Sequence, residues 1–138
     1  MALDVRGLAP LLQVYDMPTS IRFYRDMLGC TVKITSPALG GEHRFHWVLL
    51  QLGKAEFMLN TAYEFDHERP VPRDPARTAA HDDTCLYFSC SDVDAAYAEL
   101  RSRGVEVNPP TIAPYGMKQM HLHDPDGYSI CFQWAVER

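Results

Sequence analysis

The chain repeats one pattern of apolar and polar positions. In the first copy, apolar residues alternate with others up to Asp16, helical spacing follows, and the segment ends at Gly29. In the second copy, the same alternation leads to Asp92 and the helical segment ends at Gly104. Alternation is typical of a strand with one buried face, whereas a spacing of three and four is typical of an amphipathic helix. The repeat predicts two similar modules with a cleft between them.

Each predicted helix has a start signal and a stop signal. Asp16 and Asp92 are good N-cap residues, because an Asp side chain accepts hydrogen bonds from the free backbone N–H groups of the first turn. Gly29 and Gly104 can adopt the left-handed conformation that ends a helix. We expect helices over residues 16–28 and 92–103.

Strands are predicted before and after each helix, separated by turn residues such as Gly40-Gly41, Gly53-Lys54 and Asp124-Pro125-Asp126-Gly127. The expected strands cover residues 10–14, 31–36, 44–52 and 55–60, and then residues 86–90, 105–108, 117–123 and 128–134. The element order is therefore βαβββ, repeated.

We expect a single domain, because 138 residues with 46% hydrophobic content suit one core. Within it, module 1 spans about 7–60, a connecting loop 61–83, and module 2 about 84–136. The loop contains Pro70, Pro72, Pro75 and many charges, with no sustained apolar period. It is interpreted as an ordered loop, either a solvated connector or a lid over a ligand.

Charge and apolar content favour a small-molecule partner. The net charge is −5, and the Lys and Arg residues are scattered, which argues against nucleic-acid binding. No apolar run reaches membrane-spanning length and no secretion signal is evident, so we expect a cytoplasmic protein without a membrane partner. The cysteines lie far apart in sequence and are expected to be free thiols.

Two motifs carry a family resemblance. The segment Phe23-Tyr24-Arg25-Asp26-Met27-Leu28-Gly29 after Asp16, and the Asp124-Pro125-Asp126-Gly127 turn before the final strand, resemble the vicinal oxygen chelate superfamily of glyoxalases, bleomycin resistance proteins and extradiol dioxygenases. The resemblance spans nearly the whole chain. It implies an α+β fold in which two tandem βαβββ modules form a curved, cleft-bearing mixed β-sheet with helices on the outer face. It also implies a homodimer.

The resemblance further implies four metal-ligand positions, which are His, Gln or Glu in metal-using members. Here they fall at Ala9, Met58, Cys85 and Cys131. This set offers neither the oxygen donors that hard cations need nor an imidazole. Two thiolates are also fewer than the four ligands of a structural zinc site. We therefore predict no metal and no cofactor.

Strand parity predicts which side chains line the cleft, because residues two apart share a face. The predicted ligand-binding residues are Gln13, Trp47, Met58, Asn60, Cys85, Tyr87, His121, Cys131 and Gln133. Trp47 is a core residue or a stacking platform. His121 and His123 have a spacing that can chelate a metal, although no carboxylate partner is evident. Glu56 is the one carboxylate expected on the cleft side, and a solvated role is favoured over that of a general base.

The leading functional hypothesis is metal-independent binding or sequestration of a small aromatic or amphipathic molecule, as in bleomycin resistance proteins. The alternative is a lyase, isomerase or dioxygenase that uses non-standard metal ligands such as His121 with Glu56, or no metal. Cys85 and Cys131 are also considered as a thiol site, with His121 as the group that would lower a thiol pKa. No catalytic residue can be assigned from the sequence.

Overall fold

The computed structural model describes residues 2–63 and 65–137, and it contains the predicted duplication. Module 1 consists of β1 (Leu11–Val14), α1 (Met17–Ile21), β2 (Thr31–Thr35), β3 (Trp47–Leu52) and β4 (Ala55–Thr61). Module 2 consists of β5 (Cys85–Ser89), α3 (Val93–Ser102), β6 (Thr111–Ile112), β7 (Met117–His123) and β8 (Ser129–Ala135). The α+β prediction with two tandem βαβββ modules is confirmed.

Each module forms a four-stranded mixed sheet. Sheet 1 has the order β1-β4-β3-β2 and sheet 2 the order β5-β8-β7-β6. The first strand of each module pairs in parallel with the last, and the other pairs are antiparallel. The two sheets therefore share one topology, as expected for a duplicated unit.

Both helices begin where the sequence predicted. The Asp16 carboxylate accepts from the backbone N–H of Thr19, and the Asp92 carboxylate accepts from that of Ala95. The first helix is α-helical only to Ile21, and it continues as a π-helix, η1, over Arg22–Met27. The chain leaves these helices at Gly29 and Gly104, both with positive φ.

One predicted strand is wrong. Residues 105–108 are not a strand, and the edge strand β6 instead follows Pro109-Pro110 at Thr111–Ile112. The backbone N–H of Val105 donates to the Leu100 carbonyl at the end of α3, and the two prolines have no N–H to give to a ladder. The sheet therefore resumes only beyond the prolines. The strand predicted over 44–52 also begins later, at Trp47.

The connection over residues 61–83 contains more structure than expected. It includes α2 (Pro75–Ala80) between two short 3-10 turns, η2 (Asp66–Glu68) and η3 (His81–Asp83). Asp74 caps α2 by accepting from the backbone N–H of Ala76, and Pro75 occupies the first helical position. The Asp74-Pro75 pair is a helix-start signal, so this helix could have been predicted.

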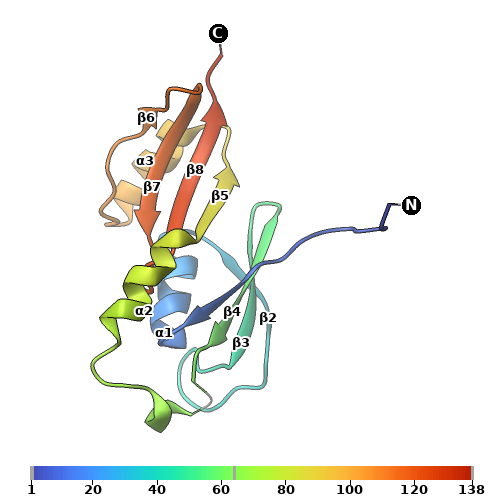
Figure 1. The fold of residues 1–138 in the computed structure, drawn as a ribbon, viewed down its shortest axis with the longest axis vertical. Helices are drawn as coiled ribbons and strands as arrows, with labels where there is room; N and C mark the ends of the chain where they lie inside the picture. The colour runs from blue at the N-terminus through green and yellow to red at the C-terminus, as the bar shows by residue number, and fades with distance from the viewer. Residues whose placement is uncertain (1, 64, 138) are drawn as a thin grey trace.

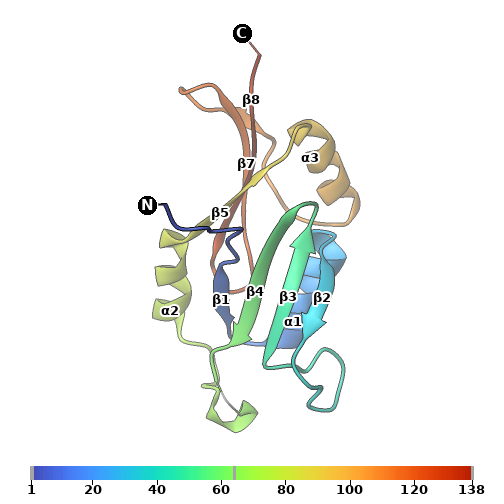
Figure 2. The ribbon, with the colours of Figure 1, turned by 90° about the vertical axis from the view of Figure 1, so that its right-hand side faces the viewer.

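One hydrophobic core joins the modules. Phe57 of sheet 1 and Phe88 of sheet 2 make an edge contact with ring centroids 5.9 Å apart, and Phe88 in turn stacks on Phe132. Figures 1 and 2 show α1 on one face of sheet 1 and α3 on one face of sheet 2. We call the opposite face of each sheet its open face. The two open faces point in different directions, because sheet 1 faces the viewer in Figure 2 and sheet 2 does so in Figure 1.

Within residues 2–63 and 65–137, no helix has the length and apolar character needed to cross a bilayer. Cys30, Cys85, Cys90 and Cys131 are free thiols, as predicted.

Candidate functional site

The open face of sheet 2 carries five of the predicted ligand-binding residues. Strand pairing places Cys131 of β8 between Tyr87 of β5 and His121 of β7. Gln133 lies beside Gln119 one pair further along, and Cys85 starts β5 opposite Ser129. Tyr87 is 56% exposed, so its ring is an exposed aromatic surface on this face.

Amide and hydroxyl groups on this face form a connected network. The Gln119 side-chain amide donates to the Tyr115 hydroxyl and to the Gln133 side-chain oxygen, both at 2.9 Å. The Gln119 side-chain oxygen lies 3.4 Å from Nε2 of His121. Gln119 is buried, so its orientation is fixed by these bonds. The network gives the face oriented polar groups next to the exposed ring of Tyr87.

The two thiols on this face are not activated. Burial and the neighbouring Cys85 raise the pKa of Cys131 to about 11, and burial raises the pKa of Cys85. His121 Nε2 lies 3.9 Å from the Cys131 sulfur. A nucleophilic cysteine requires a lowered thiol pKa, so the structure does not favour the thiol-site hypothesis.

The open face of sheet 1 carries the other four predicted residues. Pairing places Gln13 beside Asn60, which in turn lies beside Trp47, while Met58 lies beside Leu11. The Gln13 side-chain oxygen accepts from Arg77 of α2 at 3.0 Å. The helix that sequence analysis missed therefore reaches the edge of this face and holds one predicted binding residue.

The predicted residues thus form two groups, one on the open face of each sheet. The alternative pair of Glu56 and His121 is divided in the same way, because Glu56 lies on β4 and His121 on β7. Glu56 is ion-paired with Lys33 at 2.6 Å. The Glu56 carboxylate therefore has a cationic partner on strand β2.

The residues present do not fit a divalent metal centre. Among the described residues, no three His, Cys, Asp or Glu side chains come together in a way that could hold an ion. His123 does have a carboxylate partner, contrary to expectation, because its Nε2 lies 2.6 Å from Oδ1 of Asp82. Asp82 belongs to η3, far from His123 in sequence, and it also accepts from Ser129. This pair lies at the β7–β8 turn and lacks a third ligand.

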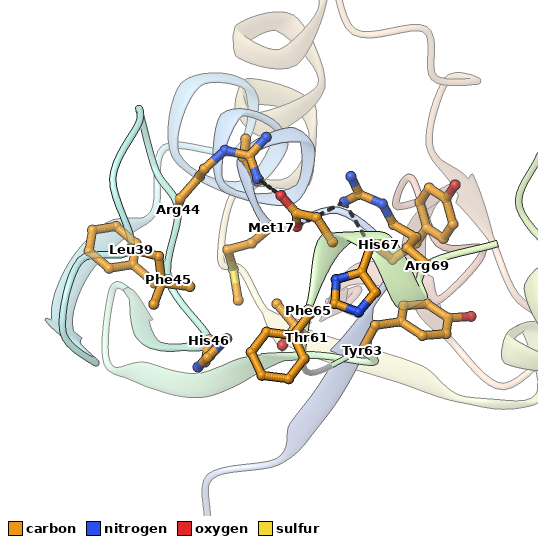
Figure 3. Close-up of a pocket in the computed structure, with 13 residues that line it drawn as sticks. Met17, Leu39, Arg44, Phe45, His46, Thr61, Tyr63, Phe65, His67 and Arg69 are labelled. Carbon is orange, nitrogen blue, oxygen red and sulfur yellow. Dashed lines mark hydrogen bonds and ion pairs between the residues drawn. The ribbon is translucent and has the colours of Figure 1, made fainter. Parts of the chain in front are cut away.

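A pocket that the sequence did not predict lies at one end of sheet 1. We call this cavity of about 490 Å³ the loop pocket (Figure 3). It is bounded by the start of α1 and by two loops that carry Phe45, Tyr63, Phe65, His67 and Arg69. Its signal in the sequence is the group of aromatic residues within otherwise polar loops.

The comparisons with known proteins agree with this architecture. The family model described as "Glyoxalase/Bleomycin resistance protein/Dioxygenase superfamily" matches residues 8–132. Because the match covers most of the chain, the protein belongs to this superfamily, and the resemblance found in the sequence is confirmed.

Individual relatives have conserved the fold more than the sequence. The chain is 33% identical over 118 residues to the uncharacterized protein YaeR of Escherichia coli K12. The matched segment covers 83% of this chain and 84% of YaeR. TnmS3, an antibiotic binding protein from Streptomyces sp. CB03234, matches 98% of this chain and 100% of its own, with a TM-score of 0.67 and 23% identity. A bleomycin-binding protein complexed with bleomycin matches 96% of this chain and 100% of its own, with a TM-score of 0.67 and 16% identity.

Proposed function

We propose that this protein binds a small aromatic or amphipathic molecule without a metal ion, on the open sheet faces. The observation that carries the proposal is the face of sheet 2, where the exposed ring of Tyr87 lies beside the oriented network of Gln119, Gln133 and Tyr115. A ring for stacking and a few fixed polar groups are what small-molecule sites typically combine. Two proteins of the same fold are named for binding an antibiotic and bleomycin, which supports this ligand class.

Metal independence rests on the donor set. The resemblance implies that the ligand positions of metal-using members fall at Ala9, Met58, Cys85 and Cys131 in this chain. Two thiols alone do not complete a metal site, and among residues 2–63 and 65–137 no three His, Cys, Asp or Glu side chains lie close enough together to hold an ion. Binding must then come from stacking, apolar contact and hydrogen bonds.

We further propose a homodimer in which each open face is covered by the second copy. Leu11 is 48% exposed and Tyr87 56%, and the two faces of one chain point in different directions. Sheet 1 of one chain placed over sheet 2 of the other would bring the two groups of predicted residues together. The same contact would remove Leu11 and Tyr87 from water.

The test is isothermal titration calorimetry of the full chain with a panel of aromatic antibiotics, including metal-free bleomycin, in the presence of EDTA. Tyr87→Ala is expected to weaken binding of the panel's best ligand about tenfold or more, because it removes the stacking ring. Trp134→Ala is the matched control. Like Tyr87, Trp134 of β8 is an exposed aromatic residue, but it lies on the opposite face of sheet 2 from Cys131. Absence of binding at 1 mM by every compound, or binding only after a divalent metal is added, would overturn the proposal.

Sedimentation velocity tests the dimer separately. The wild-type chain is expected to sediment as a dimer and Leu11→Asp as a monomer, because a charge would be buried at the contact. Val71→Asp, at another highly exposed apolar position, is the control and should remain dimeric. A wild-type monomer at 100 µM would contradict the shared-face arrangement.

A further inference from the structure

The loop pocket lies on the side of sheet 1 away from its open face. Trp47 and Asn60 point to the open face, so the adjacent residues His46 and Thr61 point to the other side, where they line the pocket. Met17 and Pro18, at the start of α1, lie on that side too. The loop pocket is therefore distinct from the faces to which binding was assigned above.

Aromatic rings form much of its wall. Phe65 and His67 are stacked with ring centroids 5.5 Å apart and planes at 10°, and Figure 3 shows Tyr63 next to them. Phe65 is 55% exposed, so it is not a core residue. The cavity volume of about 490 Å³ falls within the usual range of roughly 300–1,000 Å³ for small-molecule sites.

Two guanidinium groups flank one carboxylate at the rim. Arg44 forms an ion pair with Asp66, and Nη1 of Arg69 lies 4.0 Å from the same carboxylate (Figure 3). Arg69 also has a closer partner, because it donates to Asp16 at 2.7 Å. The position of the Asp66 carboxylate is therefore an anion site, and the protein's own side chain occupies it.

The Asp66 side chain can leave this position at low cost. It is 63% exposed and belongs to the three-residue turn η2, and exposed ion pairs contribute little to stability. Among the described residues, the ion pair that would remain at the two guanidiniums without Asp66 is that of Arg69 with Asp16. One of the two guanidinium charges would then have no carboxylate partner among the described residues, so the site could take one negative charge beside the aromatic wall.

We propose that the loop pocket binds a planar aromatic compound with one carboxylate, and that Asp66 competes with this carboxylate for Arg44. The aromatic body lies against Phe65 and Tyr63, and the ligand carboxylate takes the place of the Asp66 carboxylate. Bidentate pairing of a carboxylate with a guanidinium gives the site its preference for an acid over the corresponding amide.

The test is calorimetric titration of the full chain with 2-naphthoate and, in parallel, with the uncharged 2-naphthamide. Asp66→Asn is expected to bind 2-naphthoate about two- to fivefold more tightly than the wild type, the factor expected for releasing an exposed ion pair. Arg44→Gln is expected to bind it about tenfold more weakly. Neither variant should change the binding of 2-naphthamide by more than about twofold.

Glu68→Gln is the matched control, because Glu68 lies on the same turn, carries the same charge and does not line the pocket. An equal gain in Glu68→Gln would mean a general charge effect and would overturn the proposal. So would undetectable binding of 2-naphthoate to both the wild type and Asp66→Asn, or binding unaffected by Arg44→Gln in a variant whose thermal midpoint is unchanged. Loss of binding in Tyr87→Ala would place the acid on sheet 2 and refute the loop pocket, whatever the outcome of the antibiotic titrations.

Discussion

The hydroxyl of Tyr24 donates a hydrogen bond of 2.7 Å to Oδ2 of Asp124, a hundred positions further along the chain. Both side chains are buried. Tyr24 belongs to the first helix and Asp124 to the turn between β7 and β8, so the bond joins the two modules. Oδ1 of Asp124 also accepts from the backbone N–H groups of Asp126 and Tyr128, which fixes the turn.

Tyr24→Phe should destabilise the protein by about 1–3 kcal/mol. The substitution keeps the ring but leaves Oδ2 of the buried Asp124 without a donor. Urea unfolding at pH 7, followed by circular dichroism, measures the difference in free energy of unfolding. Tyr97→Phe is the control and should change it by less than about 0.5 kcal/mol, since the Tyr97 hydroxyl accepts a hydrogen bond from Arg101 at an exposed position. Equal effects of the two substitutions would contradict the importance of the intermodule bond.

Asp124 should also make stability depend on pH. Burial raises the pKa of its carboxyl from 3.8 to about 6, although the hydrogen bond from Tyr24 acts in the opposite direction. Between these two pH values the folded protein binds more protons than the unfolded chain. The stability that this group contributes is therefore fully present below about pH 4 and is lost as the pH rises through about 6.

The comparison with Asp124→Asn isolates this effect, because groups common to both proteins cancel in the difference. We expect the wild type to lose roughly 2–3 kcal/mol relative to Asp124→Asn between pH 4 and pH 7. Urea unfolding of both proteins at several pH values gives the curve. If the wild type instead gained stability relative to Asp124→Asn as the pH rises, the pKa of the Asp124 carboxyl would be lowered in the folded state.

Gly127→Ala should be more harmful than Gly53→Ala. Both glycines have positive φ, so an added side chain strains the backbone at either position by about 1 kcal/mol. At Gly127 a Cβ would also collide with the Thr78 carbonyl of α2, whereas it would meet nothing within 4 Å at Gly53. We expect a loss of about 2 kcal/mol or more for Gly127→Ala, measured by thermal unfolding. Similar midpoints for the two variants would show that α2 does not pack against this turn.

Cys131 and Cys30 should resist alkylation in the folded protein. Burial, together with Cys85, raises the pKa of Cys131 to about 11, and burial raises that of Cys30 to about 12. Two pKa units lower the reactive thiolate fraction about a hundredfold. Iodoacetamide labelling at pH 7.5, followed by peptide mass spectrometry, compares native protein with chain unfolded in urea. Labelling of Cys131 at the same rate in both would revive the thiol-site hypothesis.

Much of the fold could be predicted because its signals are local. The alternation before Asp16 and Asp92 and the glycines that end the helices depend only on neighbouring residues. The strand at 105–108 was wrong because the backbone N–H of Val105 donates to the Leu100 carbonyl at the end of α3, and the edge strand begins only beyond Pro109-Pro110. The helix at Pro75–Ala80 was missed although Asp74-Pro75 marks its start.

The sequence by itself determined the duplicated βαβββ scaffold, because alternation, helical spacing and helix caps are properties of short segments. Through the family resemblance it also led to the prediction that Ala9, Met58, Cys85 and Cys131 hold no metal. Only the tertiary structure decided which way the two open faces point, that Asp82 reaches His123, and that Asp66 lies between Arg44 and Arg69. These relationships join residues from separate elements. Their geometry depends on how the modules and loops pack, which no local pattern specifies.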